Sequence, residues 1–182
     1  MKKWPEVKTE RLVLRILELK DKEVFLAYRG NPAVVQFQTW DPPSLQEVER
    51  FIQQNLAVIP NTPNTWLQLG ITLHNDQLIG DIGLHFLEDG AQMEIGYTLA
   101  PEHQGQGYAF EAVKAILGYL FGQLEKHRIT ASVDPENVRS RRLLEKLGFR
   151  QEGFFIQSIL IRGEWCDDVV YAMLAEEWKT KR

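Results

Sequence analysis

Apolar residues recur along the chain at two spacings, and these spacings predict its strands and helices. Several segments either alternate between apolar and polar residues or form short apolar runs between turn residues. We expect strands over residues 11–16, 65–73, 77–86, 91–99, 128–133, 149–160 and 165–174. Turn-like pairs separate consecutive strands at Asn75-Asp76, Asp89-Gly90 and Arg162-Gly163.

Other segments carry apolar residues at the three- and four-residue spacing of a helix. We expect helices after Asp21, after Ser44, over 109–121, and over 136–147. Asp21 stands in an N-cap position, and Ser44 with Glu47 has the spacing of a capping box. Gly148 stands where a glycine ends a helix. The stretch 30–44 is rich in loop residues.

The order of these segments predicts a mixed α+β fold. Antiparallel strands come first, and a strand–helix–strand crossover around residues 93–133 makes its two strands parallel neighbours. A twisted sheet with helices on both faces is the simplest architecture consistent with this order. We expect one domain over residues 1–182, because no loop-rich stretch is long enough to be a linker.

Composition and charge narrow the classes of function. The 182 residues carry a formal net charge of −4, which argues against nucleic acid as the main partner. No apolar run approaches the ~20 residues of a membrane span, and no apolar stretch follows the N-terminal lysines. Cys166 is the one cysteine, and the histidines show no metal-ligand spacing. We therefore expect a cytoplasmic protein without a disulfide, a metal site, or a nucleic-acid or membrane partner.

The segment Gln104-Gly105-Gln106-Gly107-Tyr108-Ala109 joins the strand over 91–99 to the long apolar helix. Glycine lets a ligand approach the backbone closely, and the free N–H groups at a helix start attract anions, so the segment predicts a phosphate site. A P-loop would need a Lys followed by Ser or Thr where Tyr108 and Ala109 stand. A dinucleotide fingerprint would need a third glycine at Phe110, although Glu125 has the spacing of a ribose-binding acid. A tight turn without a ligand is a further interpretation.

The other candidate is the acyl-coenzyme A loop, Gln/Arg-x-x-Gly-x-Gly/Ala, which the segment matches at every specified position. Here the chain resembles the GCN5-related N-acetyltransferase (GNAT) superfamily, in particular its RimJ/RimL-type ribosomal-protein N-terminal acetyltransferases. The further motifs that carry the resemblance are Thr9-Glu10-Arg11-Leu12, Glu94-Ile95-Gly96-Tyr97, Asn137-Val138-Arg139-Ser140, Leu144-Glu145-Lys146-Leu147-Gly148-Phe149 and Gly163-Glu164-Trp165 with Asp167. The resemblance implies the GNAT fold, with a six- to seven-stranded, mostly antiparallel sheet and a splayed parallel strand pair around the cofactor.

The resemblance also implies an activity. It indicates an acyltransferase that moves the acetyl group of acetyl-CoA to a primary amine by direct attack in a ternary complex. The acceptor would be a protein N-terminal α-amine or a small amine, such as a polyamine or a drug-like amine. A non-catalytic acyl-CoA-binding module stays open, because Leu144 stands where many members place a tyrosine proton donor. The family includes monomers and dimers, so a homodimer is compatible with the resemblance.

Cofactor-binding roles follow from the same resemblance. Backbone groups of Tyr97 and Leu99 would hold the pantetheine arm, and Gln104, Gly105, Gln106, Gly107, Tyr108 and Ala109 would hold the pyrophosphate. Asn137 would lie near the cofactor arm, or it would only begin the following helix.

Two residues are candidates for the chemistry. Glu94 falls on the polar face of its strand beside Gly96, and the resemblance implies that it would act as a general base through water; a surface glutamate is the alternative. The resemblance also implies that Ser140 would hydrogen-bond the leaving sulfur; a hydrogen bond only to its own helix backbone is the alternative. On the acceptor side, Trp40 beside Asp41 would receive a cationic amine, whereas we expect Phe37 to anchor its loop in the core.

Overall fold

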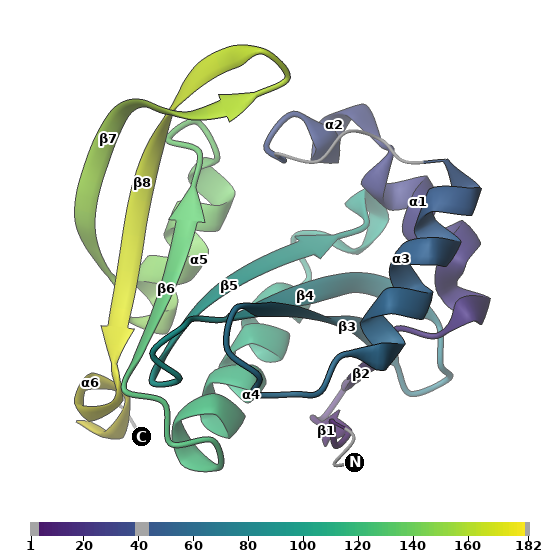
Figure 1. The fold of residues 1–182 in the computed structure, drawn as a ribbon, viewed down its shortest axis with the longest axis horizontal. Coiled ribbons are helices and arrows are strands. Elements are labelled where there is room, and N and C mark those ends of the chain that lie inside the picture. Colours follow the sequence, from purple (N-terminus) through teal and green to yellow (C-terminus); the bar gives the residue numbers. More distant parts are fainter. Residues whose placement is uncertain (1–3, 39–43, 181–182) are drawn as a thin grey trace.

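The computed structural model describes residues 4–38 and 44–180. One eight-stranded sheet, in the order β1-β2-β3-β4-β5-β6-β8-β7, runs through the molecule (Figure 1). Its strands are β1 (Val7–Lys8), β2 (Leu12–Ile16), β3 (Thr65–Leu73), β4 (Leu78–Phe86), β5 (Gln92–Leu99), β6 (Arg128–Val133), β7 (Arg150–Ile161) and β8 (Glu164–Leu174). The mixed α+β fold predicted from the sequence is confirmed. The two-residue strand β1 was not predicted from the apolar pattern.

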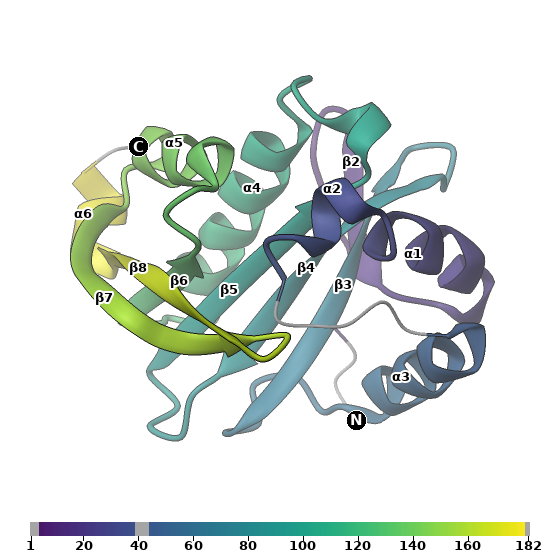
Figure 2. The ribbon, with the colours of Figure 1, turned by 90° about the horizontal axis from the view of Figure 1, so that it is seen from above.

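Helices cover both faces of this sheet. They are α1 (Lys22–Arg29), α2 (Pro32–Val35), α3 (Leu45–Ala57), α4 (Tyr108–Gly122), α5 (Val138–Leu147) and α6 (Ala175–Thr180), with short 3-10 turns η1 (Leu19–Asp21) and η2 (Pro101–His103). Figures 1 and 2 show α1 and α3 against one face of β3 and β4, and α4 against the other. In the two described ranges, no helix is long and apolar enough to cross a membrane.

The helix ends show how the sequence sets these elements. Ser44 caps α3 in the predicted capping box with Glu47, and Gly148 ends α5 at a φ of 95°, a conformation that favours glycine. Asp21 is the N-cap residue of α1, as predicted, but it makes no side-chain cap hydrogen bond. Its carboxylate accepts hydrogen bonds from Arg15 and from the backbone N–H of Glu18 instead. The buried guanidinium of Arg15 is the stronger partner for that carboxylate.

The core explains why α4 is almost entirely apolar. Val113, Ile116, Leu117 and Leu120 are fully buried in one core cluster with residues of the sheet. Alternate residues of β3, Leu67, Leu69 and Ile71, are buried with them. The residues that alternate with these, Trp66, Gln68 and Thr72, therefore project to the opposite face, where α1 and α3 lie. That second face carries polar side chains of the sheet centre, among them Gln68 and Asp81.

The parallel pair β5 and β6 opens near its middle. The strands pair only at Gln92 with Arg128, Met93 with Ile129, and Glu94 with Thr130. Beyond Glu94, β5 continues to Leu99 beside β4 alone, while β6 turns away toward β8. Figure 1 shows the two strands diverging as a V. The splayed pair that the family resemblance implied is thus present, and Glu94 lies at its vertex.

The long hairpin of β7 and β8 reaches over the polar face of the sheet. Its tip lies beside α2 in both ribbon views (Figures 1 and 2). Arg162 at the tip donates a hydrogen bond of 2.5 Å from Nη2 to the backbone oxygen of Val35 in α2. The hairpin and α2 together therefore enclose the space above the opening between β5 and β6.

Candidate functional site

Two adjoining pockets open at the splayed strands. The larger, of about 1110 Å³, lies between the loop that precedes α4, the start of α4, and the exposed face of α5. The smaller, of about 390 Å³, lies over the polar face of β3, β4 and β5 and under the β7–β8 hairpin. Small-ligand sites usually measure roughly 300–1,000 Å³, so the larger pocket suits a large cofactor and the smaller one a modest substrate.

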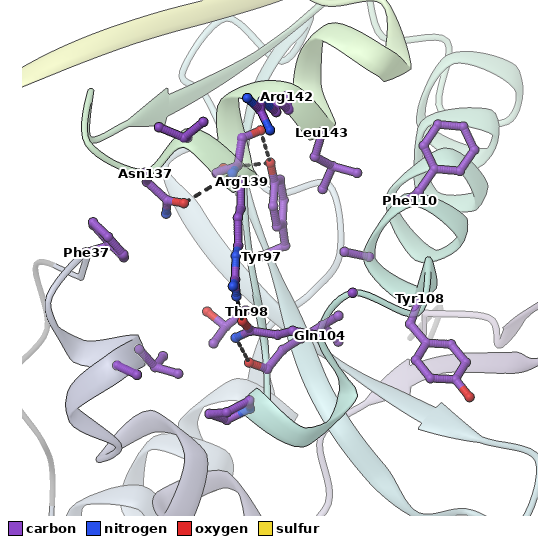
Figure 3. A pocket seen from close by; sticks show the side chains of 18 of the residues that line it. Phe37, Tyr97, Thr98, Gln104, Tyr108, Phe110, Asn137, Arg139, Arg142 and Leu143 are labelled. Carbon is purple, nitrogen blue, oxygen red and sulfur yellow. Dashed lines mark hydrogen bonds between the residues drawn. The ribbon is translucent and has the colours of Figure 1, made fainter.

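The loop before α4 has the shape of a ligand cradle. Gly105 and Gly107 both have positive φ, at 76° and 82°, where an L side chain is strained. A Cβ at Gly105 would meet no atom within 4 Å, so the glycine leaves open space over the backbone. Gln104 stiffens the loop, because its amide nitrogen donates 3.0 Å to the Leu99 oxygen and its amide oxygen accepts 2.9 Å from Arg139. Figure 3 shows Arg139 reaching down from α5 to Gln104.

The start of α4 is suited to an anion. Gly107 is its N-cap residue and has no side chain to accept from the first turn, and within the described chain no other side chain caps it. In contrast, Ser44 caps α3 and Asn137 caps α5. The N–H groups at the start of α4 therefore face the larger pocket with the positive end of the helix dipole behind them.

Basic side chains form the opposite wall of the larger pocket. Arg139, Arg142 and Lys146 are three and four residues apart on α5, so they share one face of that helix. Lys146 also lies over the ring of Phe110, at 4.7 Å from its centroid. A cationic wall facing a helix start is a favourable place for a ligand that carries several phosphates.

The two pockets share six lining residues, and these mark where their contents would meet. They are Phe37, Gln38, Tyr97, Thr98, Asn137 and Ser140. Figure 3 shows Tyr97, Thr98 and Asn137 around the cavity, with Phe37 at its rim. Gln38 donates 3.1 Å from its amide to the Thr98 hydroxyl, so the chain after α2 is tied to β5 at this junction.

Tyr97 brings its side chain, not only its backbone, to the junction. Its phenol oxygen lies 2.8 Å from the Ser140 hydroxyl oxygen. Burial raises the pKa of Tyr97 above its ordinary value, and the hydrogen bond with Ser140 opposes that effect. The Ser140 backbone N–H donates 3.1 Å to Asn137, which fixes the start of α5. Ser140 lines both pockets, its predicted role at the sulfur stays a prediction, and the phenol side chain beside it was not predicted from the sequence.

Glu94 lines the smaller pocket at the vertex of the splayed strands. Its carboxylate oxygen Oε2 is 3.6 Å from Nδ1 of His85 on β4. Asp134, Asp167 and Asp168 also line this pocket, together with the aromatic rings of Phe37, Phe51 and Trp66. Carboxylates next to aromatic faces favour a cationic ligand.

A buried polar network supports the junction from below. The carboxylate of Asp81 is fully buried in β4 and accepts from Tyr28 at 2.6 Å and from Nε of Arg29 at 3.1 Å. Burial, followed by the charge of Asp81, raises the pKa of Tyr28 well above its usual value. Arg29 also donates a hydrogen bond to the Gln38 amide oxygen, so the network links α1 to the chain that follows α2.

The structure brings most of the predicted site residues together. Leu99, Gln104, Gly105, Gly107, Tyr108 and Ala109 line the larger pocket. Gln106 does not belong to that lining, and its backbone oxygen accepts 3.0 Å from Arg11. Tyr108 turns its ring under the Arg11 guanidinium, at 4.5 Å from the ring centroid, so only its backbone can serve a phosphate. Asn137 caps α5 and also lines both pockets.

Of the two expectations on the acceptor side, the one for Trp40 stays a prediction and the one for Phe37 is wrong. Trp40, with Asp41, lies outside the described residues. Phe37, which we expected to anchor its loop in the core, is only half-buried and lines both pockets. In the part of the chain that the structure describes, no group of His, Cys, Asp or Glu side chains is arranged to hold a metal ion.

The comparisons with known proteins agree on one family, the GNAT acetyltransferases. The acetyltransferase (GNAT) domain profile matches residues 11–150. The N-acetyltransferase YnaD of Bacillus subtilis is 34% identical over 172 residues, which are 94% of this chain and 98% of that protein. The [ribosomal protein uS5]-alanine N-acetyltransferase of Escherichia coli is 39% identical over 88 residues, which are 48% of this chain and 45% of that protein. An acetyltransferase (GNAT family) structure from Bacillus anthracis superposes with a TM-score of 0.86 at 32% identity, covering 94% of this chain and 99% of that one.

Proposed function

This chain belongs to the GNAT acetyltransferase family, and from that premise we propose how its two pockets divide the reaction between donor and acceptor. The protein is an N-acetyltransferase that transfers an acetyl group to an amine. GNAT acetyltransferases take the acetyl group from acetyl-CoA. We assign the larger pocket to acetyl-CoA and the smaller pocket to the amine, so that the two meet at the six shared residues.

Several features of the larger pocket fit acetyl-CoA. The uncapped start of α4 and the open space over Gly105 suit the pyrophosphate. The cationic face of α5, with Arg142 and Lys146, suits the remaining phosphate charge. The length of β5 beyond Glu94 lacks a β6 partner, so its backbone groups near Tyr97 and Leu99 are placed to hydrogen-bond an extended arm. When bound there, acetyl-CoA supplies an activated acetyl thioester.

Glu94 is our candidate for the general base. An amine is mostly protonated at neutral pH, because its pKa is about 8 for an α-amine and about 10.4 for a lysine-type amine. A carboxylate at the vertex of the splayed strands can take this proton, directly or through one water molecule. The amine nitrogen then attacks the acetyl carbonyl carbon, the new C–N bond forms, and the C–S bond breaks.

Ser140 is our candidate for the donor to the departing sulfur. Its hydroxyl lines both pockets and contacts the Tyr97 phenol at 2.8 Å. Ser140 can donate a hydrogen bond to the sulfur while it accepts one from Tyr97. Leu144, where many family members have a tyrosine, is fully buried and cannot take this role.

We propose a primary amine that is cationic before reaction as the acceptor. The carboxylates and aromatic rings of the smaller pocket support this choice. The relative that acts on an alanine of ribosomal protein uS5 supports a peptide N-terminal α-amine, and small amines are the other members of the class. We also propose that the 182 residues form a single acetyltransferase domain, and a homodimer stays a prediction.

The observation that carries this assignment is the set of residues shared by the two pockets. It is tested by binding acetyl-CoA in a calorimeter to Gly105→Glu, beside Gly90→Glu as a matched control. Both glycines have positive φ, at 76° and 69°, and at both a Cβ meets no atom within 4 Å, so the backbone strain is similar. Gly90 lies in the turn between β4 and β5, far from the loop at 104–109. We expect Gly105→Glu to abolish acetyl-CoA binding and Gly90→Glu to preserve it; equal affinities would overturn the assignment.

A further inference from the structure

Three side chains form a row across the polar face of the sheet. Trp66 of β3 is the register partner of His85 of β4, and His85 is the register partner of Glu94 of β5. Directly opposite residues on antiparallel strands project to the same face and touch their neighbours. The row therefore leads from the outer rim of the smaller pocket, at Trp66, to the candidate base at Glu94.

Trp66 covers the ring of His85. The two rings are stacked, with centroids 4.5 Å apart and planes only 7° from parallel. Trp66 as a residue is 49% exposed, which is unusual for a tryptophan, whereas the histidine side chain beneath it is 25% exposed. The stack fixes the plane of the imidazole, so only the atoms at its edge can meet the strand beside it.

The edge that faces β5 carries a nitrogen without a partner. Nδ1 of His85 is buried and makes no hydrogen bond within the described residues. It lies 3.6 Å from Oε2 of Glu94, which is beyond hydrogen-bond length but within reach of a small side-chain rotation. Buried polar atoms nearly always find a partner, and Glu94 is the charged group that faces this atom from β5. Trp66, on the other neighbouring strand, is uncharged.

We propose that His85 is a positioning residue for Glu94 in acetyl transfer. In this proposal Nδ1 carries the hydrogen and donates it to the Glu94 carboxylate when the acceptor occupies the smaller pocket. Catalytic hydrogen bonds are often long in a free enzyme and shorten in the reacting complex. The amine proton moves to Glu94, while His85 gains and loses none. The donated bond favours the ionised carboxylate and aims its second oxygen at the amine.

This inference rests on the proposed role of Glu94, and two variants of His85 separate it from a purely structural role. His85→Phe keeps an aromatic ring under Trp66 and removes the nitrogen. His85→Asn removes the ring and retains an amide N–H near the place of Nδ1. If stacking alone matters, Phe is the conservative replacement; if the hydrogen bond matters, Asn is.

The measurement is steady-state release of coenzyme A thiol, with an alanine-initiated peptide and spermidine as acceptor probes. We expect His85→Phe to lower kcat by about tenfold or more, the usual effect of losing a hydrogen bond to a charged group, with KM for acetyl-CoA and the melting temperature unchanged. We expect His85→Asn to recover most of that loss. The inference would be overturned if His85→Phe had the kcat of the parent protein, or if the kcat of His85→Asn were no higher than that of His85→Phe.

Glu94→Gln distinguishes this inference from the base assignment on which it rests. If Glu94→Gln leaves kcat unchanged, the base assignment itself fails. If Glu94→Gln lowers kcat and His85→Phe does not, only the positioning role fails. In the Glu94→Gln background we expect His85→Phe to have no further effect, because the two residues act as one unit. A full additional loss in that background would contradict the proposal.

Discussion

The phenol oxygen of Tyr97 lies 2.8 Å from the hydroxyl oxygen of Ser140, where β5 and α5 meet across the junction of the two pockets. Burial raises the pKa of Tyr97 above its ordinary value, so the phenol stays protonated through the range of usual assays. A neutral phenol can keep Ser140 oriented toward the sulfur. The chain thus offers a hydroxyl pair at the junction, although Leu144 leaves the usual tyrosine position without one.

Removal of either hydroxyl should slow the chemical step. We expect Ser140→Ala to lower kcat by about tenfold to hundredfold, and Tyr97→Phe by less, because Tyr97 acts through Ser140. Asn137 accepts from the backbone N–H of residue 140, so α5 keeps its cap in Ser140→Ala. Thiol-release kinetics measure both variants, and KM for acetyl-CoA serves as the control for binding. Unchanged kcat in Ser140→Ala would remove this residue from the mechanism.

The cationic face of α5 should contribute to acetyl-CoA affinity. We expect Arg142→Ala to weaken binding by about three- to tenfold at low salt, and by less at high salt, because exposed charges are screened. Calorimetric titration at two ionic strengths measures the effect. Arg50→Ala removes the same charge from an exposed position on α3 and is the matched control. The prediction is wrong if the two variants bind acetyl-CoA equally well.

The buried carboxylate of Asp81, beneath the smaller pocket, should contribute strongly to the unfolding free energy of the protein. Asp81→Asn removes the negative charge with which Arg29 pairs, and breaking a buried ion pair costs about 3–5 kcal/mol of unfolding free energy. Urea unfolding measures the loss. Glu6→Gln, which alters an exposed pair with Lys8 at 3.3 Å, should change stability by less than about 1 kcal/mol. A similar small change in Asp81→Asn would show that the network is dispensable.

The sheet edge offers a test of pH dependence. Hydrogen bonds from Arg128, and then from Arg150, lower the pKa of Glu152 from 4.5 to about 2. A lowered folded-state pKa stabilises the protein above pH 4.5, and this contribution disappears as the pH falls toward 2. The melting temperature of Glu152→Gln should therefore lie below that of the parent protein near pH 7, and the gap should close with acid. A gap that stays constant between pH 7 and pH 2.5 would contradict the assigned pairing.

Local signals in the sequence predicted much of the fold. The capping box at Ser44, the glycine stop at Gly148 and the apolar periodicity of α4 each depend on residues within a few positions of one another. The N-cap position of Asp21 was predicted in the same way, but the sequence did not reveal that its carboxylate pairs with Arg15 and not with the helix N–H groups. The two-residue β1 could not be predicted, since so short a strand is defined by its pairing with β2 and not by its own pattern.

In the candidate site, too, the features that are local in sequence could be predicted, and the contacts between different elements could not. The cradle at 104–109 is continuous in sequence, so its glycines could be interpreted directly. The contacts of Tyr97 with Ser140 and of His85 with Glu94 join different elements, and they depend on strand register and on the angle at which α5 packs. The alternation of residues on β5 did predict a polar face that carries Glu94. It could not reveal which side chains of neighbouring strands would be opposite one another.

Release of coenzyme A thiol, measured together with formation of acetylated amine, tests the central claim most directly. With acetyl-CoA and a panel of peptide N-termini, polyamines and aminoglycosides, we expect the protein to release one thiol for each amine acetylated. Glu94→Gln should bind acetyl-CoA with unchanged affinity and turn over at least about a hundredfold more slowly. If Glu94→Gln is as fast as the parent protein, or if no amine in the panel elicits thiol release, transfer at the junction of the two pockets is contradicted.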